Sequence, residues 1–262
     1  MPFKTILCSV LLLLLASSPA QGRKEILTVS GQMDWKPFLM KHQHTEEFYG
    51  AMYEILKQAS EANGYELDYR DYPWKRAVVS LEKGRLDVIC GMFWNPQRGP
   101  KYNFSAPIIR NQLRIFTTKP FRMDSLSDLI GRKGDIIRGG SYGETFDTFI
   151  RCGKADFTEV TDDNTALNRL VRGYSDFFIG TYIDTMLKIS ERNLMDTIVP
   201  LPYIVDNVDV YFAFARHSRN KPAYEEIKLT LERMQQNGTI RSILEKYFQG
   251  TGISPETVLI GQ

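Results

Sequence analysis

Arg98 and three tryptophans, Trp35, Trp74 and Trp94, are the residues whose types and positions suggest a chemistry. A guanidinium group offers a rigid fork that matches a carboxylate in bidentate fashion. An indole ring forms a flat wall that suits planar or cationic groups. Each residue also has an ordinary alternative, because an arginine can pair with a surface acid and a tryptophan can belong to the core. Arg98 by itself is explained at least as well by pairing with a surface acid, so a role in binding an anionic molecule depends on where the chain places these side chains.

Residues 72–107 show how Arg98 is positioned. Apolar residues recur on one face of a predicted helix that ends at Gly84, a residue suited to the left-handed position after a helix. Residues 86–90 then have the continuous apolar character of a buried strand, and Arg98 lies in the loop that follows it. Because ligands bind at the carboxyl ends of strands in open α/β sheets, we expect this loop to face a ligand.

The tryptophans share this placement in loops. Trp35 follows the first predicted strand, Trp74 stands at the start of the helix after Pro73, and Trp94 lies in the Arg98 loop. Core packing would scatter three tryptophans over strands and helix faces. Their common position predicts an aromatic box at one edge of one sheet.

Hydrophobic periodicity and glycine breaks predict an α/β fold in which the order of elements repeats. Strands are predicted at 26–30, 65–69, 86–90, 134–137 and 175–179, and extended crossings at 112–118 and 208–215. Helices are predicted at 49–63, after the glycine-rich turn 139–143 to about 150, at 164–172, from 183, at 222–236 and at 239–248.

Two crossings predict that one lobe is inserted into the other. The first lobe would comprise 24–115 plus 209–250, and the second 116–208. Such a chain can hinge, because two short segments carry the rotation. The tail, 251–262, has no clear periodicity and could be loose, so the sequence leaves its order open.

The first 20 residues have the features of a signal peptide. Lys4 supplies positive charge, an apolar run at 6–16 is too short to span a bilayer, and Ser18 and Ala20 provide the small residues of a cleavage site. A membrane anchor is the alternative. We expect a soluble protein exported to the periplasm.

The charge balance, cysteines and histidines of the chain argue against a nucleic-acid-binding protein, a disulfide bond and a metal site. The chain has 33 basic and 31 acidic residues, and the leader removes only Lys4, so nucleic acid is not an expected partner. Cys90 and Cys152 are expected to be separate thiols, buried or partly buried, because a bond between them would lock the lobes together. With three histidines and no close Cys/His pairs, we expect no metal and no cofactor. We expect a monomer.

The order of motifs from about Leu27 to Phe248 resembles the solute-binding proteins of ABC importers, in particular the polar amino acid-binding family. The residues that carry the resemblance are Gly84, Asp87, Asn95, Pro96, Gln97, Arg98, Phe104, Ser105, Ala106 and Pro107. The resemblance implies a two-lobed periplasmic-binding fold of type II, with a mixed sheet and flanking helices in each lobe and two hinge strands. It also implies a small-molecule ligand bearing a carboxylate and a membrane permease as partner.

The resemblance further implies roles for individual residues. Arg98 would hold the ligand carboxylate, Trp35 would stack on the ligand, and the turn after the first strand of the second lobe would grip the carboxylate from the other side. The ligand-binding set is therefore expected to be Trp35, Trp74, Gly91, Met92, Trp94, Arg98, Ser141, Tyr142, Gly143, Thr181 and Tyr182.

One position departs from the family. Amino acid binders place an acid after the second lobe-2 strand, where it pairs with the ligand's α-amino group. Thr181 stands there in this chain, and Asp184 would compensate only with a shifted register. A carboxylate-bearing ligand, an amino acid or a related molecule, is still expected, but this departure puts a standard α-amino acid in doubt.

Three functions remain open at this point: importer binding protein, sensory binding module, and an enzyme similar to cyclohexadienyl dehydratases. An enzyme would need an acid/base pair in the cleft. Asp34, Glu144 and Asp184 are candidates, but they form no cluster in the sequence. The expectation is a binding protein without catalytic residues.

Overall fold

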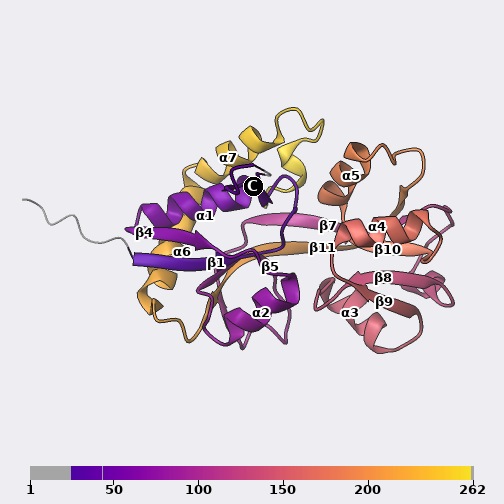
Figure 1. Cartoon of the computed structure of the whole chain (residues 1–262), viewed down its shortest axis with the longest axis horizontal. Helices are drawn as coiled ribbons and strands as arrows, with labels where there is room; N and C mark the ends of the chain where they lie inside the picture. The colour runs from indigo at the N-terminus through magenta and orange to yellow at the C-terminus, as the bar shows by residue number, and fades with distance from the viewer. Residues whose placement is uncertain (1–24, 43, 261–262) are drawn as a thin grey trace, which may run out of the picture.

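The structure, a computed structural model, describes residues 25–42 and 44–260. Figure 1 shows two lobes side by side, joined by the long strands β7 (Ile109–Thr117) and β11 (Val199–Ala215). This confirms the predicted α/β fold with two lobes and two crossing strands. The predicted signal peptide lies outside the described residues.

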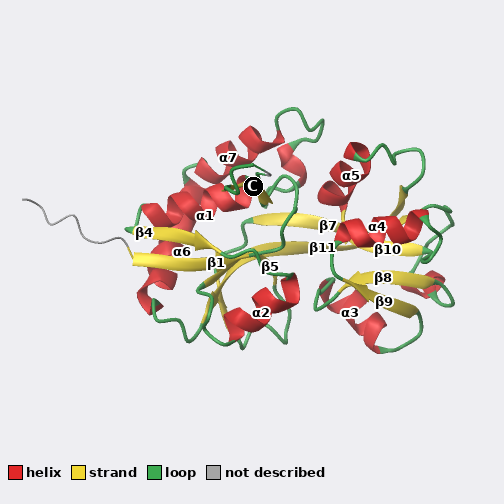
Figure 2. Cartoon of the chain, viewed as in Figure 1, coloured by secondary structure: helices red, strands yellow, loops and turns green. Residues whose placement is uncertain are grey.

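The first lobe is built from both ends of the chain. Its strands and helices, coloured by type in Figure 2, are β1 (Glu25–Ser30), β2 (Met40–Lys41), β3 (Phe48–Tyr49), α1 (Ala51–Glu61), β4 (Tyr65–Tyr69), α2 (Trp74–Glu82), β5 (Val88–Phe93), β6 (Tyr102–Phe104), α6 (Lys221–Gln236) and α7 (Thr239–Phe248).

The second lobe is built from the middle of the chain. Its elements are the 3₁₀ helix η1 (Leu126–Leu129), β8 (Lys133–Ile137), α3 (Gly143–Arg151), β9 (Asp156–Val160), α4 (Asp163–Val171), β10 (Phe177–Thr181) and α5 (Tyr182–Glu191).

Pairing links nearly all strands into one mixed sheet, because β7 and β11 run through both lobes. The order is β4-β1-β5-β11-β7-β10-β8-β9, with β6 also on β11 and β2-β3 as a separate pair. Strands β4, β1 and β5 are parallel to one another, as are β9, β8 and β10, while β11 is antiparallel to β5 and β7. The carboxyl ends of both parallel groups therefore meet where the lobes face each other.

Each lobe has a hydrophobic layer on both faces of the sheet. In the first lobe α1, α6 and α7 cover one face and α2 the other; in the second, α3 covers one face and α4 and α5 the other. Both faces are apolar because successive side chains of a buried strand point to opposite faces of the sheet. In β10, Phe177 and Ile179 pack under α3, whereas Phe178 packs under α4.

A β-bulge at Gly91 breaks this alternation in β5. Cys90 packs towards α1, yet Met92, two residues later, packs under α2 on the opposite face. Gly91 has φ of 95°, and the pairing with β11 shifts register at the same point. Because a bulge inserts one residue, it re-aims every side chain that follows. Phe93 is thereby turned towards the gap between the lobes.

Several sequence predictions need correction. Strand β5 runs on to Phe93 and β10 to Thr181, so both end two or three residues later than expected. Strand β9 was not predicted. The tail, whose order the sequence left open, is not loose over its described part, since it forms the 3₁₀ helix η2 (Pro255–Thr257) and buries Val258 completely. None of the helices among the described residues is long and apolar enough to cross a membrane.

Candidate functional site

A cavity lies between the two lobes at the meeting strand ends. It encloses about 620 Å³ of space, counted out to the solvent at its mouth. Seven of the predicted ligand-binding residues line it: Trp35, Trp74, Gly91, Arg98, Ser141, Tyr142 and Thr181.

Arg98 is the main charged group on the first-lobe side of this cavity. Its side chain is buried, and the residue is 8% exposed. Its Nη1 donates to the Phe93 carbonyl oxygen at 3.0 Å and its Nη2 to the Gly139 carbonyl oxygen of the second lobe at 3.3 Å. It forms no ion pair within the described part of the chain. Burial lowers the pKa of Arg98, and the Asp147 carboxylate opposes that shift.

Asn95 sets the position of Arg98. Its Oδ1 accepts from the backbone N–H groups of Gln97 at 3.1 Å and Arg98 at 2.8 Å, which closes the turn that carries the arginine. Its Nδ2 donates to Ser141 Oγ across the lobes at 3.0 Å. Asn95 belonged to the sequence motif but not to the predicted ligand-binding set, and it positions Arg98 without lining the cavity itself.

Trp35 and Trp74 form aromatic walls of the cavity. Trp35 is buried, packs on Phe38 with ring centroids 4.6 Å apart, and lies against Gly91. An added Cβ at Gly91 would meet the Trp35 ring at 2.5 Å, so the bulge glycine makes room for this indole. Trp74 donates from Nε1 to the Gly139 carbonyl oxygen at 3.0 Å. The Arg98 guanidinium lies 5.7 Å from the Trp74 ring centroid.

The turn before α3 is occupied by a carboxylate of the chain itself. Asp147 accepts from Ser141 Oγ at 2.5 Å and from the Tyr142 N–H at 2.7 Å. The Tyr142 hydroxyl in turn accepts from the Ile137 N–H at 2.6 Å. The sequence predicted that this turn would grip a ligand carboxylate, but Asp147 already takes the Tyr142 N–H. The turn still brings Gly140, Ser141 and Tyr142 to the cavity wall.

Four predicted residues lie away from the cavity. Met92 is buried under α2 because of the bulge, and Trp94 is 51% exposed with its ring beside Gly99. An added Cβ at Gly143 would meet the Asp206 carboxylate, so Gly143 faces β11. Tyr182 is stacked with the Arg114 guanidinium at 4.4 Å. The aromatic box therefore consists of two tryptophans rather than three.

Other residues reach the cavity without having been predicted. They are Gln32, Phe93, Leu113, Ile137, Gly140, Asp163, Ile179, Gly180 and Val210. Most come from the last residues of strands or from the crossing strands. Reading each strand to its true end would have found Phe93, Ile179 and Gly180.

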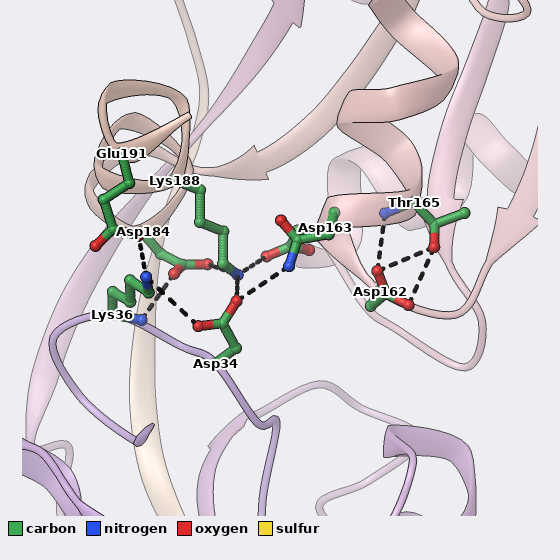
Figure 3. A network of polar contacts seen from close by, with 9 residues as sticks. Asp34, Lys36, Asp162, Asp163, Thr165, Asp184, Lys188 and Glu191 are labelled. Atoms are coloured by element: carbon green, nitrogen blue, oxygen red, sulfur yellow. Dashed lines mark hydrogen bonds and ion pairs between the residues drawn. The ribbon is translucent and has the colours of Figure 1, made fainter. Parts of the chain in front are cut away.

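An ion cluster bridges the lobes beside the cavity (Figure 3). Lys188 of α5, 4% exposed at its side chain, donates to Asp163 at 2.7 Å and Asp184 at 2.9 Å, with Asp34 of the first lobe 3.9 Å away. Asp184 also accepts from the Lys36 N–H at 2.7 Å. The Lys36 ammonium pairs with Glu191 at the rim. These contacts join the loop after β1 of the first lobe to α4 and α5 of the second.

Burial and charge act in opposite directions within this cluster. Burial by itself lowers the pKa of Lys188, but the carboxylates of Asp163, Asp184 and Asp34 outweigh it, so the pKa is raised. Burial raises the pKa of Asp184 well above its ordinary value, although Lys188 opposes the shift. The arrangement therefore favours the charged form of Lys188, while burial makes Asp184 harder to ionise than an exposed aspartate.

No group of three His, Cys, Asp or Glu side chains in the part of the chain that the structure describes is placed to hold a metal ion. Cys90 and Cys152 are both free thiols; Cys90 is buried as expected, but Cys152 is exposed rather than partly buried.

Comparison with known proteins gives the family. The family model of the bacterial extracellular solute-binding proteins, family 3, matches residues 27–250. The chain belongs to this family. It is a solute-binding protein, as the sequence motifs indicated.

Individual relatives are distant. The L-cystine-binding protein TcyA of Bacillus subtilis (strain 168) is 22% identical over 232 residues, which cover 86% of this chain and 82% of TcyA. A histidine kinase sensor domain with similarity to periplasmic binding proteins superposes with a TM-score of 0.77 at 22% identity, covering 87% of this chain and 97% of that one. A structure from work on glutathione import through GshT and the cystine ABC importer TcyBC of Streptococcus mutans superposes with a TM-score of 0.74 at 20% identity, covering 88% of this chain and 98% of that one.

Several motif residues of this solute-binding protein are structural. Asp87 accepts from the Thr28 N–H and hydroxyl, both at 2.8 Å, and so ties β1 to β5. Ser105 Oγ accepts from the Phe212 N–H of β11 at 3.1 Å. Neither residue lines the cavity. The motif therefore combines one cavity-lining group, Arg98, with structural contacts made by Asp87 and Ser105.

Thr181 lies at the cavity wall as the N-cap residue of α5. Asp184, one turn later, is fully buried and bonded to Lys188 and the Lys36 N–H, so it does not compensate for the missing acid.

Proposed function

We propose that this chain is the solute-binding component of an ABC-type importer and binds a small carboxylate-bearing solute by closure of its lobes. The observation that carries the proposal is the buried Arg98 guanidinium, which faces an enclosed interlobe cavity and forms no ion pair among the described residues. A buried cation of this kind supplies a charge-assisted site for an anion.

Closure follows from where the contacts lie. Arg98, Trp74 and Asn95 of the first lobe all bond to the segment Gly139 to Ser141 of the second. A ligand that touches both sides adds contacts that exist only in the closed form, and it therefore shifts the population towards that form. The predicted lobe boundaries, 24–115 plus 209–250 and 116–208, belong to this proposal.

We further propose that the chain is exported to the periplasm by its leader, acts there as a monomer without catalysis, and delivers its ligand to a membrane permease. Support comes from the family, whose members are extracellular, and from the S. mutans structure described with the importer TcyBC. The acids considered for catalysis also support a binding role: Asp34 and Asp184 lie in the ion cluster, and Glu144 pairs with Arg151 at 2.8 Å.

A test begins with the mature protein purified without denaturation. Mass spectrometry of the released small molecules should identify a carboxylate, and adding it back should reduce the radius of gyration in solution scattering. A constant radius with independently confirmed binding would contradict closure. Loss of uptake of that solute on deletion of the chain's gene would establish import.

A sensory role is the second candidate, because one of the similar solved structures is a kinase sensor domain. In that case uptake would persist after deletion, while a transcriptional or behavioural response to the solute would be lost.

A further inference from the structure

The charges around the cavity restrict what a ligand can carry. Among the described residues that line it, only Arg98 and Asp163 bear a charge in their ordinary forms at neutral pH. The other polar side chains at the wall, Gln32, Ser141 and Thr181 among them, are neutral hydrogen-bonding groups.

The carboxylate of Asp163 is already paired with a cationic side chain of the protein itself. Lys188 Nζ lies 2.7 Å from Asp163 Oδ2, and both side chains are almost fully buried. The neighbouring acids do not restore a free negative charge. Neither Asp184 nor Asp34 lines the cavity: Asp184 accepts from Lys188 Nζ at 2.9 Å and from the Lys36 N–H at 2.7 Å, and Asp34 lies 3.7 Å from the Lys36 ammonium.

The positive charge of Arg98 is not matched in this way. Its partners are the carbonyl oxygens of Phe93 and Gly139, and the nearest carboxylate that acts on it, Asp147, is bonded to Ser141 and Tyr142. Within the described residues, the cavity thus presents one unpaired cation and no unpaired anion.

The remaining wall is apolar and aromatic. Trp35 and Trp74 lie on the first-lobe side, and Phe93, Leu113 and Ile179 close the inner part. A ligand body in contact with these groups loses its water, so an ammonium group there would be desolvated without a carboxylate to pair with.

From this balance of charge we propose that the ligand is a carboxylate that carries no ammonium group and has an apolar or aromatic body. The proposal rests on the proposed function and narrows its ligand class, since it excludes the zwitterionic α-amino acids.

Calorimetry with matched pairs tests it directly: 3-phenylpropionate against L-phenylalanine, and 4-methylpentanoate against L-leucine. Each pair differs only by the amino group. We expect the acid without the amino group to bind about tenfold more tightly or better, because an unpaired buried charge is costly. Equal or tighter binding of the amino acid would overturn the inference and leave the binding function intact.

Two variants are designed to place an unpaired carboxylate at the cavity wall and so to change which ligand is preferred. Thr181→Asp adds an unpaired carboxylate to the wall, and Lys188→Met frees Asp163; each should shift the preference towards the amino acid. Lys154→Met, an exposed lysine after α3, is the matched control and should leave the preference unchanged. Circular dichroism checks folding, and Thr181→Asp serves if Lys188→Met does not fold. An unchanged preference in a folded Thr181→Asp protein would contradict the inference.

Binding by none of these acids at millimolar concentration would also count against the inference. The proposed function is then judged separately, by whether any solute co-purifies with the protein.

Discussion

At the scale of single residues, Arg98 carries the largest expected effect. Replacing it by alanine removes a buried charge–carboxylate pair, which costs on the order of 2–5 kcal/mol of binding free energy. The measurement is calorimetry with the co-purified ligand. Arg110→Ala is the control, because Arg110 is exposed on β7 and paired with Asp209. Unchanged affinity in Arg98→Ala would remove this residue from the site.

Gly91 gives a second test at this scale. In Gly91→Ala the new Cβ would meet the Trp35 ring at 2.5 Å, and the residue would keep a φ of 95°. We expect a loss of about 1–3 kcal/mol in stability from backbone strain, together with weaker binding because Trp35 is displaced. Denaturant unfolding and calorimetry measure the two effects.

Gly64→Ala is the matched control for Gly91→Ala. Gly64 has a φ of 80°, but nothing lies within 4 Å of an added Cβ. This control should lose stability through strain alone and keep its affinity. Equal affinity in both variants would show that Trp35 is not held in place by Gly91.

The sequence predicted cavity residues correctly where a side chain suited to binding also stood next to the end of a strand. Arg98, Trp35 and Trp74 follow or adjoin strand ends and lie at the cavity. Met92 and Trp94 do not, because the bulge at Gly91 turns the chain after Cys90, and neither periodicity nor propensity reports a one-residue insertion.

At the scale of elements, helix α5 carries a pH dependence through Asp184. The folded protein holds a proton on Asp184 more tightly than the unfolded chain does, since burial raises its pKa from the ordinary 3.8. Its contribution to stability is therefore complete below that value and is lost as the pH rises through the raised pKa. The loss is larger the further the folded pKa lies above the unfolded one.

Asp184→Asn should imitate the neutral carboxyl group. We expect the melting temperature of the wild type, relative to Asp184→Asn, to fall as the pH rises from about 4 to 8. The exposed Asp196, changed to asparagine, is the control for removing an aspartate carboxylate from the surface. A flat difference for Asp184→Asn would mean that its pKa is not raised.

Most elements could be predicted because their patterns are local. The strand β4 and the helix α7 have the bounds that periodicity gave, whereas β5 and β10 extend further. Strand β9 was missed since it is largely exposed and lacks an apolar run. Asp147, which folds back on the α3 turn, could not be predicted, because a helix start looks the same in sequence whether its N–H groups are free or taken.

At the scale of the whole molecule, Trp74 should report the opening and closing of the lobes. Its Nε1 bonds to the Gly139 carbonyl oxygen of the other lobe, so the ring changes its environment when the lobes separate. Trp74→Phe should lose most of the ligand-induced change in intrinsic fluorescence and about 1 kcal/mol of binding free energy.

Trp94→Phe is the matched control, because Trp94 is half-exposed and lies outside the cavity. It should keep both the signal and the affinity. If Trp94→Phe removes the signal and Trp74→Phe does not, the assignment of the aromatic walls is wrong.

Because β11 lies late in the sequence, the two lobes are expected to fold in a fixed order during synthesis. One edge of β5 stays unpaired until β11 is made, more than 100 residues later, whereas β8, β9 and β10 pair with each other from contiguous sequence. An open strand edge invites association with other chains. The second lobe should therefore mature first, and the nascent first lobe should need protection until the C-terminal segment emerges. Hydrogen exchange on ribosome-bound chains stalled before β11 has emerged would show it: amides of β10 should already be protected and those of β5 should not, and the reverse pattern would refute this view.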